Sequence, residues 1–224
     1  MKRSLTGALI LCVVLFTVQC ASWSKTAKGG VYGAAGGAVV GGAIGAAAGN
    51  TLLGAIIGAA VGGAAGAYIG NYMDKQAAEM KRDLQGAKVE RVGEAIKITF
   101  DSGLLFAVDK YDLNDTSRQN LGKLATILNK YPDTNILIEG HTDSTGTHDH
   151  NMALSMNRAK AVATELAVAD VKSARFTVNG YGPDQPVSDN STVEGRQLNR
   201  RVDLAIIANE KLKKAAQDSI KGEM

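Results

Sequence analysis

The sequence predicts an α+β protein in which helices pack on one mixed sheet, preceded by a glycine-rich helical hairpin. Three patterns predict this class. Apolar residues alternate in part with polar ones in residues 89–100 and alternate again in residues 201–207, as is typical of strands. The apolar run Ile136–Ile138 leads through a polar loop into a helix with an apolar face. Glycine recurs at every fourth residue in two uncharged series, which indicates closely packed helices.

The N-terminus carries the pattern of a secretion signal. Residues 1–19 combine a positive start with a short apolar stretch. The end of this stretch, Thr17–Cys20, resembles the lipobox of bacterial lipoproteins, and the resemblance implies that Cys20 is lipidated and becomes the first mature residue. Residues 20–28 would then form a tether from the outer-membrane lipid. The alternative is ordinary cleavage nearby, which removes Cys20 or leaves it as a free thiol.

Residues 29–73 contain no charged side chain and carry the two glycine series. We interpret them as two helices of about 19 residues, joined by a turn at Gly49-Asn50, each long enough to cross a bilayer core of roughly 30 Å. Small residues let such helices approach closely in lipid, and the segment resembles glycine zippers of envelope lipoproteins. The sequence therefore predicts a membrane-associated hairpin, against the alternatives of a flexible linker or a soluble helical oligomer.

The remaining elements follow in the order β-α-β-α-β-β. A charged spacer helix over residues 74–87 precedes a globular domain over residues 88–208. In that domain, Asn114 or Asp115 can cap the first helix, whose apolar residues share one face. A charged tail over residues 209–224 is predicted to be a short, frayed helix.

The strand–loop–helix unit that begins at Ile136 places two opposite charges at one crevice. Asp143 leaves the strand end, and Arg158 lies at the border of the apolar face of the next helix. Ligands tend to collect at the carboxyl ends of strands in open α/β sheets. One anion beside one guanidinium suits a ligand that carries both an ammonium and a carboxylate. The alternative is that Asp143 and Arg158 only pair with each other.

Four motifs in this region, HTDSTG, NMALSMNRA, GYGPDQPVSDN and EGRQLNRRVD, resemble the peptidoglycan-binding OmpA-like domain. That family includes the C-terminal domain of OmpA, the Pal lipoproteins and the flagellar stator proteins. The resemblance covers residues 89–207 and implies a two-layer fold. It also implies non-covalent binding of peptidoglycan through the diaminopimelate of the stem peptide. Asp143 would accept the ligand's ammonium, and Arg158 would bind its carboxylate.

Three further residues join the predicted peptidoglycan site. Asn151 can cap the helix that bears Arg158, where backbone amides would also meet a ligand carboxylate. Thr142 and Arg200 belong to the first and last of the resembling motifs, and the resemblance implies that residues of these motifs line the same crevice. The alternative for Arg200 is that it pairs with acidic residues nearby.

The sequence gives little support to other kinds of chemistry. The net charge of +3 without a basic stripe argues against nucleic-acid binding. His148 and His150 offer two imidazoles to a metal, but no third ligand stands at a fixed distance, so no metal or other cofactor is expected. His141 and Asp143 are near a serine, yet neighbours on a strand point apart, so we predict no enzyme and no wall hydrolase.

The sequence thus predicts a lipid-anchored envelope protein that tethers the outer membrane to peptidoglycan, with its C-terminal domain in the periplasm. The rival hypothesis is a membrane-assembly protein. In that case the glycine zipper forms a homo-oligomer and the C-terminal domain only positions it.

Overall fold

The computed structural model describes residues 51–221. The predicted signal, Cys20, the tether and the first helix of the glycine-rich hairpin therefore lie outside the described residues. Within the described part, no helix is both long enough and apolar enough to cross a membrane.

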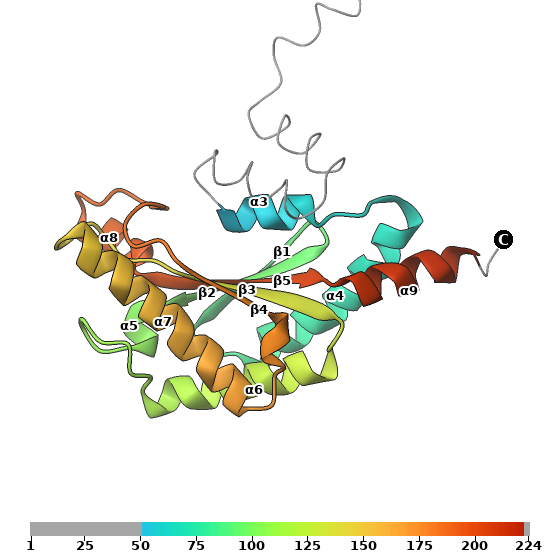
Figure 1. Cartoon of the computed structure of the whole chain (residues 1–224), viewed down its shortest axis with the longest axis horizontal. Coiled ribbons are helices and arrows are strands. Elements are labelled where there is room, and N and C mark those ends of the chain that lie inside the picture. Colours follow the sequence, from blue (N-terminus) through green and yellow to red (C-terminus); the bar gives the residue numbers. More distant parts are fainter. Residues whose placement is uncertain (1–50, 222–224) are drawn as a thin grey trace, which may run out of the picture.

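One five-stranded sheet forms the centre of the molecule (Figure 1). Its strand order is β1-β2-β5-β3-β4, with every neighbouring pair antiparallel except β3 and β4, which are parallel. This mixed sheet confirms the predicted α+β class. In spatial order, the strands are β1 (Ala87–Val92), β2 (Ala95–Asp101), β5 (Arg201–Ala208), β3 (Thr134–Gly140) and β4 (Phe176–Gly180).

Helices cover both faces of this sheet. Helices α6 (Asp115–Lys130) and α7 (His148–Val168) lie on one side, and the short α3 (Thr51–Gly58) lies on the other (Figure 1). The predicted cap of α6 is confirmed for Asn114, whose side chain accepts a hydrogen bond from the Ser117 amide at 2.9 Å. Three shorter elements complete the domain: α5 (Ser102–Leu105), the 3-10 turn η2 (Ser173–Arg175) and α8 (Val193–Asn199).

The alternating residues 89–100 form a hairpin rather than one strand. Val92 pairs with Ala95, so only Gly93 and Glu94 form the turn. Gly93 has a φ of 57°, a left-handed conformation that glycine adopts without the steric cost of a side chain. Val92 and Ile96 on either side of the turn keep the same phase, so the partial alternation by itself predicts one strand.

Helix α4 (Gly63–Asp83) crosses the predicted boundary between the glycine-rich hairpin and the spacer helix. It packs against α6, β1 and the C-terminal α9 (Glu210–Lys221), and so belongs to the globular domain. The predicted frayed tail is accordingly an ordered helix over that range, because Leu212 and Ala216 are buried against the core. The apolar faces of α4 and α9 bury each other here, a pairing that neither sequence pattern alone indicates. The core residues that α4 supplies are Ala65, Ile69, Met73, Ala77 and Met80.

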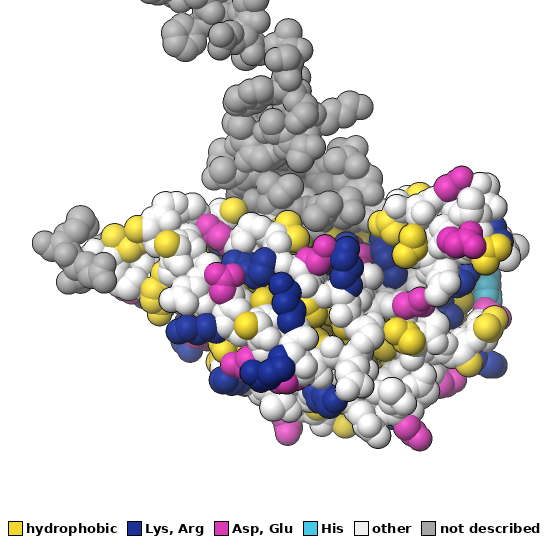
Figure 2. Space-filling model, turned by 180° about the vertical axis from the view of Figure 1, so that it is seen from behind, with side chains coloured by type: hydrophobic (Ala, Val, Ile, Leu, Met, Phe, Trp, Pro, Cys, Tyr) yellow, Lys and Arg dark blue, Asp and Glu magenta, His cyan; other side chains and the backbone are white. Residues whose placement is uncertain are grey.

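The solvated side of the molecule carries both signs of charge. In the view from behind, Lys and Arg side chains are interspersed with Asp and Glu (Figure 2). Exposed ion pairs occur as well, such as Arg82 with Asp83 in α4 at 2.7 Å. The charged segment after Tyr72 was predicted to be solvated. In the structure it forms part of α4, and only one face of this helix is solvated, because the other packs on the domain.

Candidate functional site

A pocket of about 620 Å³ opens at the carboxyl end of β3. It lies between the loop that follows β3, the first turns of α7, the end of α8 and the loop between α5 and α6. All five residues of the predicted site line it: Thr142, Asp143, Asn151, Arg158 and Arg200.

Close contact between β3 and α7 builds one wall of this pocket. A side chain at Gly140 would collide with the backbone carbonyl of Ser155, so glycine permits the helix to lie directly on the strand end. The helix begins at His148, and its cap is Thr147, whose hydroxyl accepts from the His150 amide. The prediction that Asn151 caps this helix is therefore wrong, because three helical residues already precede it.

The carboxylate of Asp143 is held on both oxygens. One oxygen accepts from the Thr145 amide at 2.8 Å, and the other lies 2.5 Å from a terminal nitrogen of Arg200. The side chain is buried, with 7% of the residue exposed. Burial alone would raise the pKa of Asp143, but the Arg200 guanidinium and the Thr145 amide outweigh it and hold that pKa below its ordinary value. Asp143 is thus ionised and pairs with Arg200, not with Arg158.

The guanidinium of Arg158 is positioned by its neighbours. The residue is 4% exposed, and its Nε donates to the Lys110 carbonyl at 2.9 Å. The ring of Phe106 lies 5.3 Å from the guanidinium carbon, within the range of a cation–π contact. Burial lowers the pKa of Arg158, and the nearby Asp109 carboxylate opposes that shift. Its two terminal nitrogens make no hydrogen bond with any residue in the range 51–221, which leaves them for a ligand.

Asn151 and Thr142 shape the loop rather than supply charge. The Asn151 amide donates to the Thr145 carbonyl at 2.9 Å, and the Thr142 hydroxyl donates to the Asp143 carbonyl at 2.9 Å. Both side chains are buried. They therefore fix the turn that presents the Asp143 carboxylate to the pocket.

Sequence reasoning missed the opposite wall of the pocket, which the loop between α5 and α6 forms. Phe106, Val108 and Asp109 come from this loop, which has neither a helical nor a strand period to identify it. Asp109 has a φ of 57°, and its carboxylate lies 2.6 Å from the His150 imidazole. His148 instead contacts Asp184 at 2.9 Å, so these two imidazoles face different carboxylates.

Two sequence-family models match the chain. A model of the OmpA family matches residues 105–200, and a model described as YMGG-like Gly-zipper matches residues 1–74. The probable lipoprotein YiaD of Escherichia coli is 38% identical over 136 residues, 60% of this chain and 62% of YiaD. The outer-membrane lipoprotein YfiB of Pseudomonas aeruginosa is 36% identical over 132 residues, 59% of this chain and 79% of YfiB. The chain therefore belongs to the OmpA family.

Solved structures share the fold. The cell wall anchor of the T6SS from Pseudomonas aeruginosa superposes with a TM-score of 0.54 at 29% identity, covering 61% of this chain and 97% of the anchor. The predicted resemblance to the OmpA-like domain is confirmed by these matches. The match nevertheless spans only 62% of the length of YiaD.

A second polar cluster lies at the end of β3, just before Asp143. Glu139 and His141 are both almost fully buried, and their side-chain polar atoms make no hydrogen bond within residues 51–221. Burial, with a contribution from Asp203, raises the pKa of Glu139 to about 7, although Arg201 and Lys97 oppose the shift. Burial, assisted by Arg201, lowers the pKa of His141 to about 3. Both groups are therefore largely neutral near pH 6.

This cluster predicts a specific effect of Glu139→Gln on stability. Between the ordinary pKa of 4.5 and about 7, the folded protein holds a proton on Glu139 that the unfolded chain has lost. Stability from this group is thus present below pH 4.5 and is lost as the pH rises towards 7. Without the carboxyl, the unfolding free energy of the variant relative to wild type should rise with pH across that window, by up to about 1.4 kcal/mol per pH unit.

Urea unfolding at several pH values in this window measures the effect. His141 opposes Glu139 in the wild type, since the stability it contributes is lost as the pH falls from 6.5 towards 3. Comparison with wild type at each pH removes this common contribution. Glu194→Gln, an exposed carboxyl on α8, is the matched control and should follow the wild-type profile. Parallel profiles for Glu139→Gln and wild type would contradict the assignment.

Proposed function

We propose that this chain binds peptidoglycan non-covalently through the diaminopimelate of the stem peptide. The observation that carries this proposal is that Arg158 and Asp143 line the same pocket, while the terminal nitrogens of Arg158 make no hydrogen bond with residues 51–221. Membership of the OmpA family supports it, as does the likeness to a protein described as a cell wall anchor. The proposed role is binding rather than catalysis.

The charges of the pocket suit the free end of diaminopimelate, where one carbon bears an ammonium and a carboxylate. The carboxylate would accept two hydrogen bonds from Arg158, in the bidentate geometry that guanidinium favours. The ammonium would approach Asp143, whose oxygens retain lone pairs beyond the bonds from Thr145 and Arg200. Three guanidinium groups line the pocket, those of Arg158, Arg196 and Arg200. Only two carboxylates line it, those of Asp109 and Asp143. The excess positive charge favours a ligand with an additional carboxylate.

In the proposed arrangement, the chain links the outer membrane to the wall. Lipid on Cys20 would anchor the N-terminus in the outer membrane, and the tether and glycine zipper would connect it to a periplasmic domain. Gly66, in the second glycine series, lies on α4 and packs against the Glu94 side chain of the same chain. This face of α4 is therefore covered by the domain itself. This packing gives no support to the rival hypothesis of zipper-driven assembly.

The test is a titration of the full chain, purified in detergent, with two muropeptides. One carries diaminopimelate at the third peptide position, and the other carries lysine there and is otherwise identical. Lysine lacks the carboxylate that Arg158 would bind, so we expect saturable binding of the first and about 10- to 100-fold weaker binding of the second. Equal affinities would exclude recognition of the diaminopimelate end, and failure of both to bind would exclude the proposed function.

A further inference from the structure

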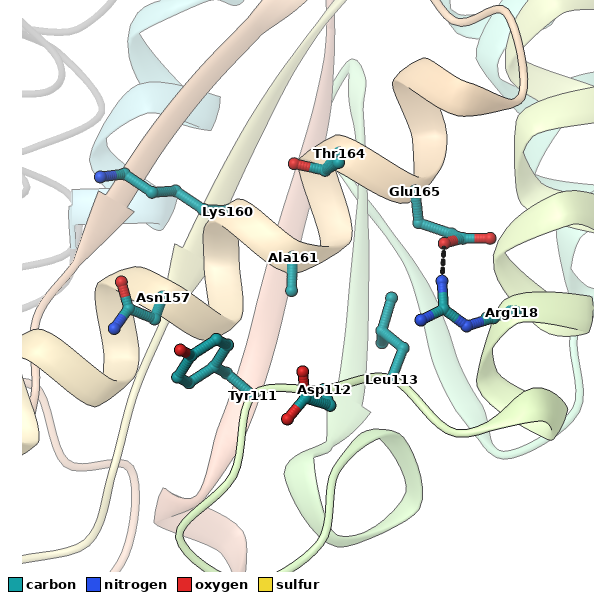
Figure 3. Close-up of a pocket in the computed structure, with 9 residues that line it drawn as sticks. All are labelled: Tyr111, Asp112, Leu113, Arg118, Asn157, Lys160, Ala161, Thr164 and Glu165. Atoms are coloured by element: carbon teal, nitrogen blue, oxygen red, sulfur yellow. Dashed lines mark hydrogen bonds and ion pairs between the residues drawn. The ribbon is translucent and has the colours of Figure 1, made fainter.

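A groove of about 340 Å³ runs beside the pocket, on the other side of the loop between α5 and α6 (Figure 3). Residues 107–109 of that loop line the pocket, and residues 111–113 line the groove. The other wall is α7, which contributes Arg158 to the pocket and Asn157 to the groove. Pocket and groove are therefore adjacent, separated by one short stretch of loop.

The groove combines an exposed aromatic ring with several polar side chains that make no hydrogen bond within residues 51–221. Tyr111 is 48% exposed, and its ring lies in the groove beneath α7, near Asn157 (Figure 3). Leu113 and Ala161 supply apolar surface beside it. Four polar side chains of the two walls make no hydrogen bond with the described part of the chain: Asp112 in the loop, and Asn157, Lys160 and Thr164 on α7.

This chemistry matches a sugar ring. A pyranose presents C–H groups on a face, which stack on an aromatic ring, and hydroxyl groups at its edge, which need amide, carboxylate or hydroxyl partners. The charges of the groove also balance. Its lining holds two cationic side chains, Lys160 and Arg118, and two carboxylates, Asp112 and Glu165. Arg118 pairs with Glu165 at 2.5 Å where α6 meets α7. A neutral ligand is therefore favoured over an anionic one.

We propose that the groove binds an N-acetylated amino sugar of the glycan strand that carries the bound stem peptide. The inference rests on the proposed binding of that peptide in the pocket. The stem peptide is joined to the glycan by an amide, and three extended residues span about 10 Å. Six residues of α7 separate Arg158 from Thr164 at the far part of the groove, a distance of about 9 Å along the helix axis. One ligand can thus occupy both places.

The experiment compares two probes on the full chain in detergent: a disaccharide-peptide containing diaminopimelate, and the same peptide without sugars. Wild type should bind the disaccharide-peptide about 5- to 10-fold more tightly, an advantage in the range of a stacked aromatic contact. Tyr111→Ala should remove this advantage and leave the affinity for the free peptide unchanged. Tyr111→Phe, which keeps the stacking face, should retain most of it.

Tyr68→Ala is the matched control, because Tyr68 is a similarly exposed tyrosine on α4 outside both lining sets. It should bind both probes like wild type. Equal affinity of wild type for the two probes would overturn the glycan site and leave peptide binding intact. Equal weakening of both probes by Tyr111→Ala would also overturn it. If wild type bound neither probe, the proposed function would fall together with this inference.

Discussion

Replacement of Arg158 by alanine is expected to weaken binding of a diaminopimelate muropeptide by at least about 100-fold. The guanidinium is held in place by the Lys110 carbonyl and the Phe106 ring, so little conformational freedom remains to be lost when a ligand binds. Its terminal nitrogens then supply two charge-assisted hydrogen bonds in a largely buried setting, each worth about 1.5–3 kcal/mol. Isothermal titration of the full chain measures the loss.

Two further variants test whether the effect is specific to the Arg158 guanidinium. Arg158→Lys retains the charge but loses the planar fork, so we expect an intermediate loss of about tenfold. Arg82→Ala removes an exposed arginine on α4 and should leave affinity unchanged. Because Arg158 also packs in the fold, the thermal midpoint of each variant is measured in parallel. A folded Arg158→Ala protein with wild-type affinity would refute the role of this side chain.

A chain that begins at Val89, the start of the OmpA-like resemblance, is expected not to fold cooperatively. It lacks α4, whose Ile69, Met73 and Met80 are fully buried in the main core. Loss of each such side chain costs about 2–5 kcal/mol, so their sum is comparable with the whole stability of a typical domain, about 5–15 kcal/mol. A chain that begins at Gly63 keeps α4 and should fold. Circular dichroism and urea unfolding distinguish the two chains.

Point variants of the full chain test the same packing with less disruption. Met80→Ala should lower the unfolding free energy by about 2–5 kcal/mol, since Met80 is fully buried between α4 and the core. Lys81→Ala, its exposed neighbour, should change it by less than about 0.5 kcal/mol. Equal midpoints for the chains that begin at Val89 and Gly63 would show that α4 is only an appended spacer.

Local patterns were sufficient for the unit that carries the site. The apolar run before Gly140, the polar loop and the helical spacing up to Leu166 all reflect burial on one face, and the structure has β3 and α7 there. The five predicted site residues converge on one pocket because they lie in or beside these elements, or in the motif before β5. Their roles in binding stay predictions until the titrations are made.

Partners that are distant in the chain were not accessible to the same reasoning. Asp143 pairs with Arg200, 57 residues away, rather than with Arg158. The pairing depends on β5 lying between β2 and β3, and the alternation of a strand says which residues are buried but not which strand is next to it. The loop with Phe106 and Asp109 has no period, so only the folded chain places it against α7.

The sequence by itself determined the α+β class, the strand–loop–helix unit and the family to which its motifs point, since periodicity and motif spacing are local properties of the chain. Only the tertiary structure decided that α4 and α9 complete the core and that one loop separates the pocket from the groove. The physical reason is that an apolar stripe on a helix or strand shows that this face is buried against another surface. Which surface covers it depends on packing between segments far apart in the chain.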